Sequence, residues 1–458
     1  MKPHWQKKII LVAALVLMCL SLLMPIIQRA SSNNVMIPLE QSFHTLQIVS
    51  DADSQYWESN TPYIWLLRAW TMWSTPIVLQ ILLGVISFIF IWLLLGSTMD
   101  NLELSIFLGT CIISPVFIIS HISLTPYAFI TCLLLAALWI SQTSWWLVGL
   151  GLFFIVGLEH VAVAAVALLG HLILHKYDLN YIPKQLGTLV ICIAGTIRLV
   201  DAFRNDISQI IPHYSTIVEF GAFIGFPLLY FILFCIGFFI TWNRGEKSTH
   251  IFALIVITLS WFYPQLLLIS NIILCYFATK SIAKTVHEKW ELPSLKVLVI
   301  VCLLIAGLVT YTLYADRLTQ APPTTNQKNS LLFLMSQSEQ DSIVWSHPKN
   351  TYLIEAIASR QSFTPAIPTK QDWLTFNSIA NETRLTAALS NLAEHNISYL
   401  YLDEQMTTGL VWSVQDEGFL LLLNNPRAFT KLYDEHGTQI YRVNYENVEE
   451  ELNKVTTK

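Results

Sequence analysis

Two aspartates lie close together near the start of the chain, in the string Asp51-Ala-Asp53-Ser-Gln-Tyr56-Trp57-Glu58. One carboxylate of such a pair can act as a general base on an acceptor, and the pair can hold a divalent cation against a phosphate leaving group. The sequence therefore marks Asp53 as a candidate general base and Asp51 as its helper or as a metal ligand. In the alternative interpretation, both are solvated loop acids or one of them caps a helix.

The aspartates fall in a segment, residues 28–75, that is longer than a connection between two helices needs. Near the end of this segment, aromatic and apolar residues recur at nearly helical spacing, which predicts a helix lying in the membrane interface. These residues are Tyr63, Leu66, Trp70 and Trp73, with Trp65 alongside. The carboxylates would then lie just above the membrane surface, where a water-side acceptor can meet a lipid-borne donor.

Glu159 and His160 form a second candidate, because they stand at a tight break between two apolar runs. An acid and an imidazole at such a place cannot face lipid cheaply, so both are expected to point into a protein cavity. There they could bind substrate, with the imidazole as a base or a phosphate contact. A plain turn at the outer surface is the alternative.

Further charged candidates follow a later apolar run. Arg198 and Arg204 could clamp the phosphate of a lipid carrier bidentately, although Asp201 and Asp206 could pair with them instead. Glu219 begins another apolar run. It is either a substrate contact or a helix N-terminal acid that the helix dipole stabilises.

The composition is typical of a membrane protein. Of the 458 residues, 54% are hydrophobic and 12% are charged, and the mean hydropathy is +0.53, which is too apolar for an ordinary soluble enzyme. The net charge of −5 is evenly spread, without the basic stripe that contact with nucleic acid needs. All seven cysteines fall in apolar stretches, so no disulfide framework or zinc site is implied.

The apolar segments predict about eleven membrane spans, several of them too short to cross unaided. They are residues 9–27, 76–97, 104–120, 127–141, 145–158, 160–175, 186–200, 218–242, 250–263, 265–282 and 295–314. The predicted fold class is a polytopic α-helical membrane protein over residues 1–316. A first segment of about nineteen residues is long for the core of a signal peptide, so we expect it to be retained.

The distribution of cations predicts the orientation. With the N-terminus in the cytoplasm, the inner loops at residues 175–184, 244–247 and 280–296 are basic, as the positive-inside rule requires. An odd number of crossings then places everything after Tyr314 outside the cytoplasmic membrane. Two sequons would be accessible there, Asn381-Glu-Thr383 and Asn396-Ile-Ser398.

The C-terminal part predicts a small extracytoplasmic α/β domain. Residues 317–328 form a linker around Pro322-Pro323, residues 329–446 form the domain, and residues 447–458 form a charged tail. Helices are expected at 330–338, 352–359, 383–394 and 418–423, and strands at 342–345, 398–402, 429–433 and 439–443.

Several side chains of this domain are of types that bind sugars: Trp345, His347, Tyr399, Asp403, Glu404 and Trp412. Most aromatic residues in a small α/β unit belong to the core, so we expect the same here. The domain is expected to orient an acceptor or to cover the membrane site rather than to perform chemistry.

Together these features resemble the GT-C glycosyltransferases. These membrane enzymes take sugars from polyprenyl-phosphate carriers, and they include protein mannosyltransferases and the catalytic subunit of oligosaccharyltransferase. The resemblance rests on the basic N-terminus, the long first outer loop with an Asp-x-x-Tyr element, the interfacial helix, the span count and the outer α/β domain. The later strings IVEFGAFIG and ISYLYLDEQMTTGLVW are similar to prokaryotic membrane proteins grouped loosely with these enzymes.

The resemblance implies a catalytic Asp in the first outer loop, for which Asp53 with Tyr56 is the best match and Asp51 the second. It implies a polyprenyl-phosphate-linked sugar as donor, an acceptor that is a protein, glycan or lipid, and a possible Mg²⁺ or Mn²⁺ ion on Asp51 and Asp53. Two departures bear on the metal. The first Arg after the element is Arg68, and residues 121–126 hold no second acidic motif.

Two other classes of function remain open. A transporter or lipid flippase would show ionisable residues at mid-membrane depth and paired broken helices in two repeated halves. A non-catalytic membrane scaffold would use its external domain to bind a partner, and its Asp51 and Asp53 would point away from any cavity at the outer leaflet.

Overall fold

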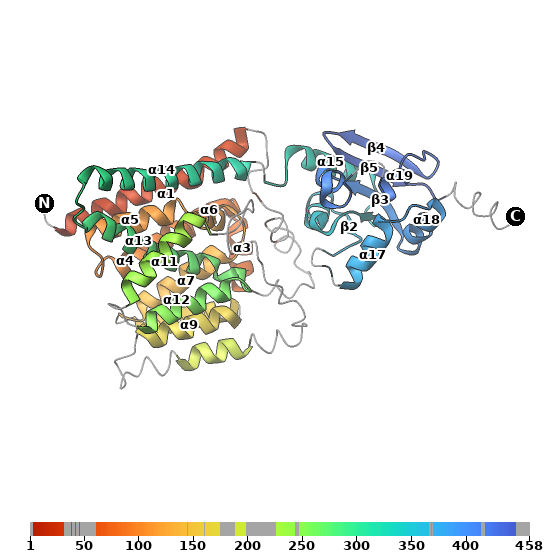
Figure 1. Cartoon of the computed structure of the whole chain (residues 1–458). Helices are drawn as coiled ribbons and strands as arrows, with labels where there is room; N and C mark the ends of the chain where they lie inside the picture. Colours follow the sequence, from red (N-terminus) through yellow and green to blue (C-terminus); the bar gives the residue numbers. More distant parts are fainter. Residues whose placement is uncertain are drawn as a thin grey trace. The chain divides into compact units, whose positions relative to one another are not determined.

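The computed structural model of the chain divides into two compact units (Figure 1). It describes residues 3–31, 61–143, 145–159, 161–174, 188–197, 226–242, 247–319, 321–365, 370–413 and 417–445, with residues 38, 42, 45 and 368. The helices up to Thr319 form the first unit, and the residues from Ala321 onward form most of the second.

The described part of each predicted apolar segment contains a helix of the first unit, and the segment at 104–120 contains two, α5 and α6. The helices are α1 (Pro3–Ser31), α3 (Pro62–Thr71), α4 (Pro76–Leu95), α5 (Asn101–Ile112), α6 (Pro115–Ile122), α7 (Tyr127–Ile140), α8 (Trp146–Glu159), α9 (Val161–Leu174), Thr188–Ile197, α11 (Leu228–Trp242), α12 (Lys247–Ser260), α13 (Leu267–His287) and α14 (Pro293–Thr319). The extra helix, α3, is the one predicted at the end of the first loop.

Four of the described helices, α1, α4, α13 and α14, are long and apolar enough to cross a membrane. The bent pair α5 and α6 brings the number to five, and the other apolar helices have 10–17 residues. The length and composition of these helices are those of a multi-pass membrane protein. The span count of eleven stays a prediction.

The bend between α5 and α6, of 57°, has a cause in the sequence. Pro115 has no N–H to donate, so the helix cannot continue through it. The Ser114 hydroxyl donates to Asn271 Oδ1 of α13 over 2.7 Å, which fixes the break against a neighbouring helix. Ser114 and Asn271 are both fully buried.

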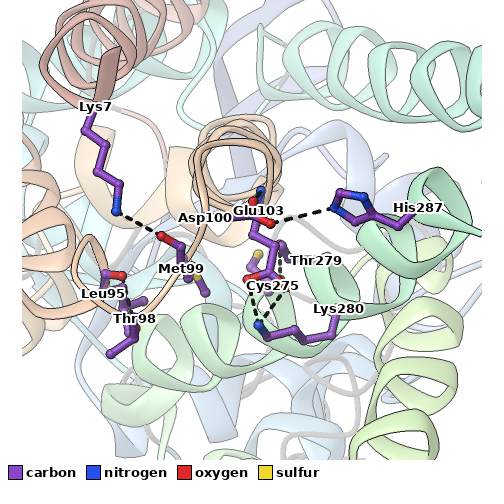
Figure 2. Close-up of polar contacts among 10 residues, drawn as sticks. All are labelled: Lys7, Leu95, Thr98, Met99, Asp100, Glu103, Cys275, Thr279, Lys280 and His287. Atoms are coloured by element: carbon purple, nitrogen blue, oxygen red, sulfur yellow. Dashed lines mark hydrogen bonds and ion pairs between the residues drawn. The ribbon is translucent and has the colours of Figure 1, made fainter. Parts of the chain in front are cut away.

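Cations and carboxylates gather where α4 turns into α5 (Figure 2). Lys280 of α13 donates to both carboxylate oxygens of Glu103 over 2.8 Å. His287 lies 3.7 Å from Asp100, and the Lys7 ammonium donates to the carbonyl of Met99 over 3.0 Å. The starts of α1 and α5 and the end of α13 therefore lie at one end of the unit.

Helices α1 and α14 run side by side in the same direction (Figure 1). The Tyr311 hydroxyl donates to the Ser21 carbonyl over 3.3 Å, and the buried Arg29 guanidinium donates to the Leu318 carbonyl over 2.6 Å. Because α1 and α14 are parallel, the start of α14 also lies at the end of the unit that holds Lys7.

The second unit is built on a five-stranded sheet with the order β2-β1-β3-β5-β4. Strands β1 (Ile343–Trp345), β2 (Gln361–Ser362) and β3 (Ile397–Leu402) are parallel, and β4 (Phe429–Glu435) and β5 (Thr438–Val443) form the predicted hairpin. Helices α15 (Thr325–Gln337), α16 (Thr351–Leu353), α17 (Lys370–Ala380), α18 (Leu385–Glu394) and α19 (Phe419–Leu422) complete it, with a π-helical turn at Ile354–Ala358.

The core of this unit is aromatic. Trp345 is fully buried and stacks on Phe376 with ring centroids 5.0 Å apart, and Trp412 lies 6.2 Å from the same indole. The expectation that these tryptophans are core residues is confirmed. The predicted strands and helices are present as well, whereas β2 and α17 were not predicted.

One glycine tests the packing of the first unit. A Cβ on Gly237 of α11 would lie 1.8 Å from the Phe277 carbonyl oxygen of α13, so the two backbones touch there. We expect Gly237→Ala to force α11 and α13 apart and to abolish the monodisperse peak of the detergent-extracted chain in size-exclusion chromatography.

Gly151→Ala in α8 is the matched control, because no atom lies within 4 Å of its added Cβ. Alanine is the better helix former by about 1 kcal/mol, so this variant should be as stable as the parent or more so. Equal behaviour of the two variants would contradict the close approach at Gly237.

Candidate functional site

Glu159 is the one predicted site residue that falls within the described part of the chain. Its side chain is buried at the C-terminal end of α8. Asp51, Asp53, Tyr56, His160, Arg198, Arg204 and Glu219 lie outside the described residues.

The Glu159 carboxylate meets the N-terminus of α3. The backbone N–H of Tyr63 donates to Glu159 Oε2 over 3.3 Å, and the N–H of Ile64 donates to the Thr61 hydroxyl over 3.4 Å. The first turn of a helix leaves such N–H groups without an internal partner. Glu159 and Thr61 therefore supply the acceptors that the buried start of α3 needs.

The negative charge of Glu159 is stabilised by the dipole of α3 rather than by that of α8, its own helix. A carboxylate at the last residue of α8 faces the negative end of that helix dipole, which is unfavourable. The positive end of the α3 dipole offsets this cost. The arrangement is thus explained by the contact between α8 and α3, and it fixes the point where the first loop enters the bundle.

Gln80 extends the same cluster into α4. The Gln80 carboxamide donates to the Tyr63 hydroxyl over 2.6 Å and to the Thr125 carbonyl over 3.4 Å. Gln80 and Tyr63 are almost fully buried. Helices α3, α4 and α8 and the connection between α6 and α7 thus meet at one end of the unit. They do so through Tyr63, Gln80, Glu159 and Thr125, which we call the α3 anchor.

The prediction for the aromatic face of α3 was wrong for one residue. Tyr63 points into the bundle and packs on Phe129 with ring centroids 5.7 Å apart, whereas Trp65 and Trp73 are exposed. Helical spacing alone does not tell which neighbouring face is buried. The lone Gln80 in an apolar run was the missed signal, because a polar side chain inside a span needs a partner.

Residues 121–126, where the resemblance places a second acidic motif, serve packing. His121 is fully buried in α6, and its Nδ1 lies 2.7 Å from the Phe117 carbonyl oxygen. Its ring lies against Gly84, where an added Cβ would come within 2.7 Å of His121 Cδ2. Thr125 belongs to the α3 anchor. The segment therefore joins α6 and α7 to α4.

The described residues hold no group of three or more His, Cys, Asp or Glu side chains that could bind a metal. Glu159 is the carboxylate of the α3 anchor, and one of its oxygens already accepts the Tyr63 N–H. The proposed metal ligands, Asp51 and Asp53, precede Thr61 by ten and eight positions in the sequence.

In the second unit, Asp403 and His347 make structural contacts. Asp403 is buried and accepts the Met406 N–H over 2.9 Å, and burial raises the pKa of its carboxyl group. The Nδ1 atom of His347 accepts the Lys349 N–H over 3.2 Å. Burial, and then the nearby Lys349 charge, lower the pKa of His347 to about 4.

No known family model matches the sequence, and no curated protein is similar to it in sequence. Solved structures are similar in fold. The oligosaccharyltransferase of Archaeoglobus fulgidus, tethered to an acceptor peptide with an NVT sequon, matches with a TM-score of 0.57 at 12% identity over 97% of this chain and 75% of that chain.

Two further structures of the Archaeoglobus fulgidus enzyme match equally well. The complex of AglB with an inhibitory peptide and a dolichol-phosphate has a TM-score of 0.55 at 12% identity over 94% of this chain and 74% of that one. The complex with Zn and sulfate has a TM-score of 0.57 at 12% identity over 93% and 73%. The chain thus shares the fold of this oligosaccharyltransferase, with a helical membrane unit and a C-terminal sheet unit, and at this identity the likeness shows the fold alone.

The α3 anchor generates a stability prediction. We expect Glu159→Ala to leave the buried Tyr63 N–H without its acceptor and to destabilise the folded chain by roughly 1–3 kcal/mol, measured by thermal unfolding in detergent. Glu159→Gln keeps an acceptor oxygen and should lose less. A Glu159→Ala chain as stable as the parent would contradict the anchoring role.

His347 generates a pH prediction for the second unit. Its folded-state pKa of about 4 lies below the ordinary value of 6.5, so the unfolded chain binds a proton first as the pH falls. The contribution of His347 to stability is therefore present above pH 6.5 and is lost as the pH falls towards 4. We expect His347→Asn, which can still accept the Lys349 N–H, to remove this part of the pH dependence in tryptophan-fluorescence unfolding curves.

Proposed function

We propose that this chain is a membrane glycosyltransferase that moves a sugar from a polyprenyl-phosphate carrier to an acceptor on the outer face of the cytoplasmic membrane. The observation that carries the proposal is a fold shared with oligosaccharyltransferase over 97% of the chain. This coverage includes the membrane unit and the sheet unit together. A non-catalytic scaffold would not need this combination of a membrane unit and a sheet unit.

The proposed base is Asp53, with Asp51 as its helper. An extended chain rises at most about 3.5 Å per residue, so eight residues keep Asp53 within roughly 28 Å of Thr61. Because the α3 anchor fixes Thr61 at one end of the bundle, it also limits where Asp53 can act. Glu159 then acts as a positioning residue through α3.

The proposed chemistry is a direct displacement at the anomeric carbon of the donor. The acceptor nucleophile bonds to this carbon while the bond to the carrier's phosphate oxygen breaks, and Asp53 takes the proton of the acceptor. Tyr56, His160, Arg198, Arg204 and Glu219 are the proposed substrate contacts. The arginines suit the phosphate of the leaving carrier because a guanidinium can bind it bidentately.

A divalent cation, Mg²⁺ or Mn²⁺, is proposed on Asp51 and Asp53, where carboxylate oxygens suit hard cations. When bound, it would neutralise charge on the leaving phosphate. A structure of the similar archaeal enzyme contains Zn and sulfate, which supports this part of the proposal.

The proposed classes of donor and acceptor rest on the same similarity to the archaeal oligosaccharyltransferase. The archaeal enzyme was solved with a dolichol-phosphate and with a peptide that contains the NVT sequon. We propose a polyprenyl-phosphate-linked donor and a protein acceptor for this chain. Glycans and lipids are the other acceptor classes, and a kinship with the prokaryotic branch of GT-C enzymes is part of the proposal.

The proposed topology places the N-terminus in the cytoplasm and the sheet unit outside. Support comes from the end of the unit drawn in Figure 2, where Lys7, Lys280 and His287 gather. The α3 anchor lies at the other end of α4. From Gln80 to Gly96 the helix rises about 24 Å, close to the thickness of the hydrocarbon layer. Lys7, Lys280 and His287 thus lie on the side opposite the α3 anchor.

The broken pair α5 and α6 is a feature that the transporter hypothesis also predicts. Transport of a fluorescent polyprenyl-phosphate analogue across liposomes that contain the chain distinguishes the two functions. Glycosyl transfer without translocation supports the enzyme.

The catalytic proposal is tested at Asp53. We expect Asp53→Ala to lower transfer from a polyprenyl-phosphate-linked sugar to a peptide by at least about 10²-fold, as for other general bases, and Asp51→Ala to cost less. EDTA should abolish activity, and Mg²⁺ or Mn²⁺ should restore it.

Asp341→Asn is the matched control, because this carboxylate is exposed in the sheet unit. It should leave the transfer rate unchanged. Full activity of the Asp53→Ala chain, expressed and folded like the parent, would end the assignment.

A further inference from the structure

The sheet unit carries two Asn-x-Ser/Thr triplets, and the structure distinguishes them. They are Asn381-Glu382-Thr383 and Asn396-Ile397-Ser398. Such a triplet is the acceptor pattern of N-linked glycosylation. The inference drawn from them rests on the proposed function, since it needs a lipid-linked sugar donor on the side where the sheet unit lies.

The first triplet lies in an exposed connection between two helices. Helix α17 ends at Ala380 and α18 begins at Leu385, and the side chains of Asn381 and Thr383 are both exposed. Within the described part of the chain, neither the Asn381 carboxamide nor the Thr383 hydroxyl makes a hydrogen bond to another residue. The two groups that a glycosyltransferase must recognise in the triplet, the Asn381 carboxamide and the Thr383 hydroxyl, are therefore accessible to solvent.

Hydrogen bonds with the Glu382 and Trp412 side chains fix the backbone of this connection. The Glu382 carboxylate accepts the backbone N–H groups of Thr383 and Arg384 over 3.1 and 3.0 Å. Behind it, the buried Trp412 indole donates to the Ala380 carbonyl over 2.9 Å. The loop thus keeps its shape without using Asn381 or Thr383.

The second triplet is part of the sheet. Asn396 is exposed but has a φ of 54°, and Ile397, which follows it, is fully buried. Ile397 and Ser398 begin β3, which pairs with β1 on one side and β5 on the other. Binding this triplet in another site would require stripping a central strand out of the sheet, at the cost of its ladder and of the buried Ile397.

We propose that Asn381 of the folded chain is itself an acceptor of the proposed reaction, and that Asn396 is not. The Asn381 side-chain nitrogen bonds to the anomeric carbon of the transferred sugar, and the bond from that carbon to the carrier's phosphate oxygen breaks. The polyprenyl phosphate leaves with the electron pair, and the amide proton passes to the Asp53 carboxylate. The product is a sugar in N-glycosidic linkage at the turn between α17 and α18.

The test uses the full chain reconstituted in liposomes with a synthetic polyprenyl-phosphate-linked sugar. Trypsin cleaves after Lys370 and Arg384, so the two triplets fall on different peptides and mass spectrometry reads them separately. We expect the sugar on the peptide of Asn381 and none on the peptide of Asn396. Asn381→Gln and Thr383→Val should lose the modification, and Thr383→Ser should keep it.

An added peptide with an Asn-x-Thr triplet separates this inference from the proposed function. If the added peptide is glycosylated and Asn381 is not, the inference is overturned and the proposed function stands. If neither is glycosylated, both fall. Modification of Asn396 in place of Asn381, or modification that persists in the Asp53→Ala chain, also overturns the inference.

Discussion

The contact between the Glu159 carboxylate and the first turn of α3 is the constraint on which the rest of the proposed site depends. A buried carboxylate is costly unless hydrogen bonds and a favourable field compensate for the lost water. The Tyr63 N–H, 3.3 Å away, and the positive end of the α3 dipole provide both. Because α3 begins at Pro62, directly after the first loop, this interaction fixes on α8 the point at which the chain enters the bundle. Gln80 extends the tie to α4 through the Tyr63 hydroxyl.

The two ends of the membrane unit differ in the polar groups they use. At the end drawn in Figure 2, Lys280 and Glu103 pair, and Lys7 is bound by carbonyls where α4 ends. At the other end, the Gln80 carboxamide donates to the Tyr63 hydroxyl, the Glu159 carboxylate accepts the Tyr63 N–H, and the Arg29 guanidinium donates to the Leu318 carbonyl. Lys7 and Lys280 therefore lie at the end that the positive-inside rule predicts to be cytoplasmic.

Most of the secondary structure could be predicted, because spans and buried strands are continuous apolar runs. The strand at Ile397–Leu402 is such a case, whereas the hairpin strands Phe429–Glu435 and Thr438–Val443 mix polar and apolar residues on either side of the turn at His436-Gly437. Helix α17 was missed because Lys370–Ala380 mixes polar and apolar residues, and β2 has only two residues. The site was harder to predict. The break at Glu159 was identified from the cost of burying an acid, but its partner is a backbone N–H, which no sequence pattern names.

Residues 121–126 show why a shared fold does not carry residue roles with it. At the place where the resemblance implies a second acidic motif and the sequence has none, His121 fills the space over Gly84 and Thr125 offers its carbonyl to Gln80. A Cβ at Gly84 would collide with the imidazole, so the glycine and the histidine depend on each other. A segment that is committed to packing α6 and α7 against α4 has no acid to contribute to a phosphate site. The proposed base and its helper are therefore the aspartates of the first loop, and the α3 anchor limits how far that loop can reach.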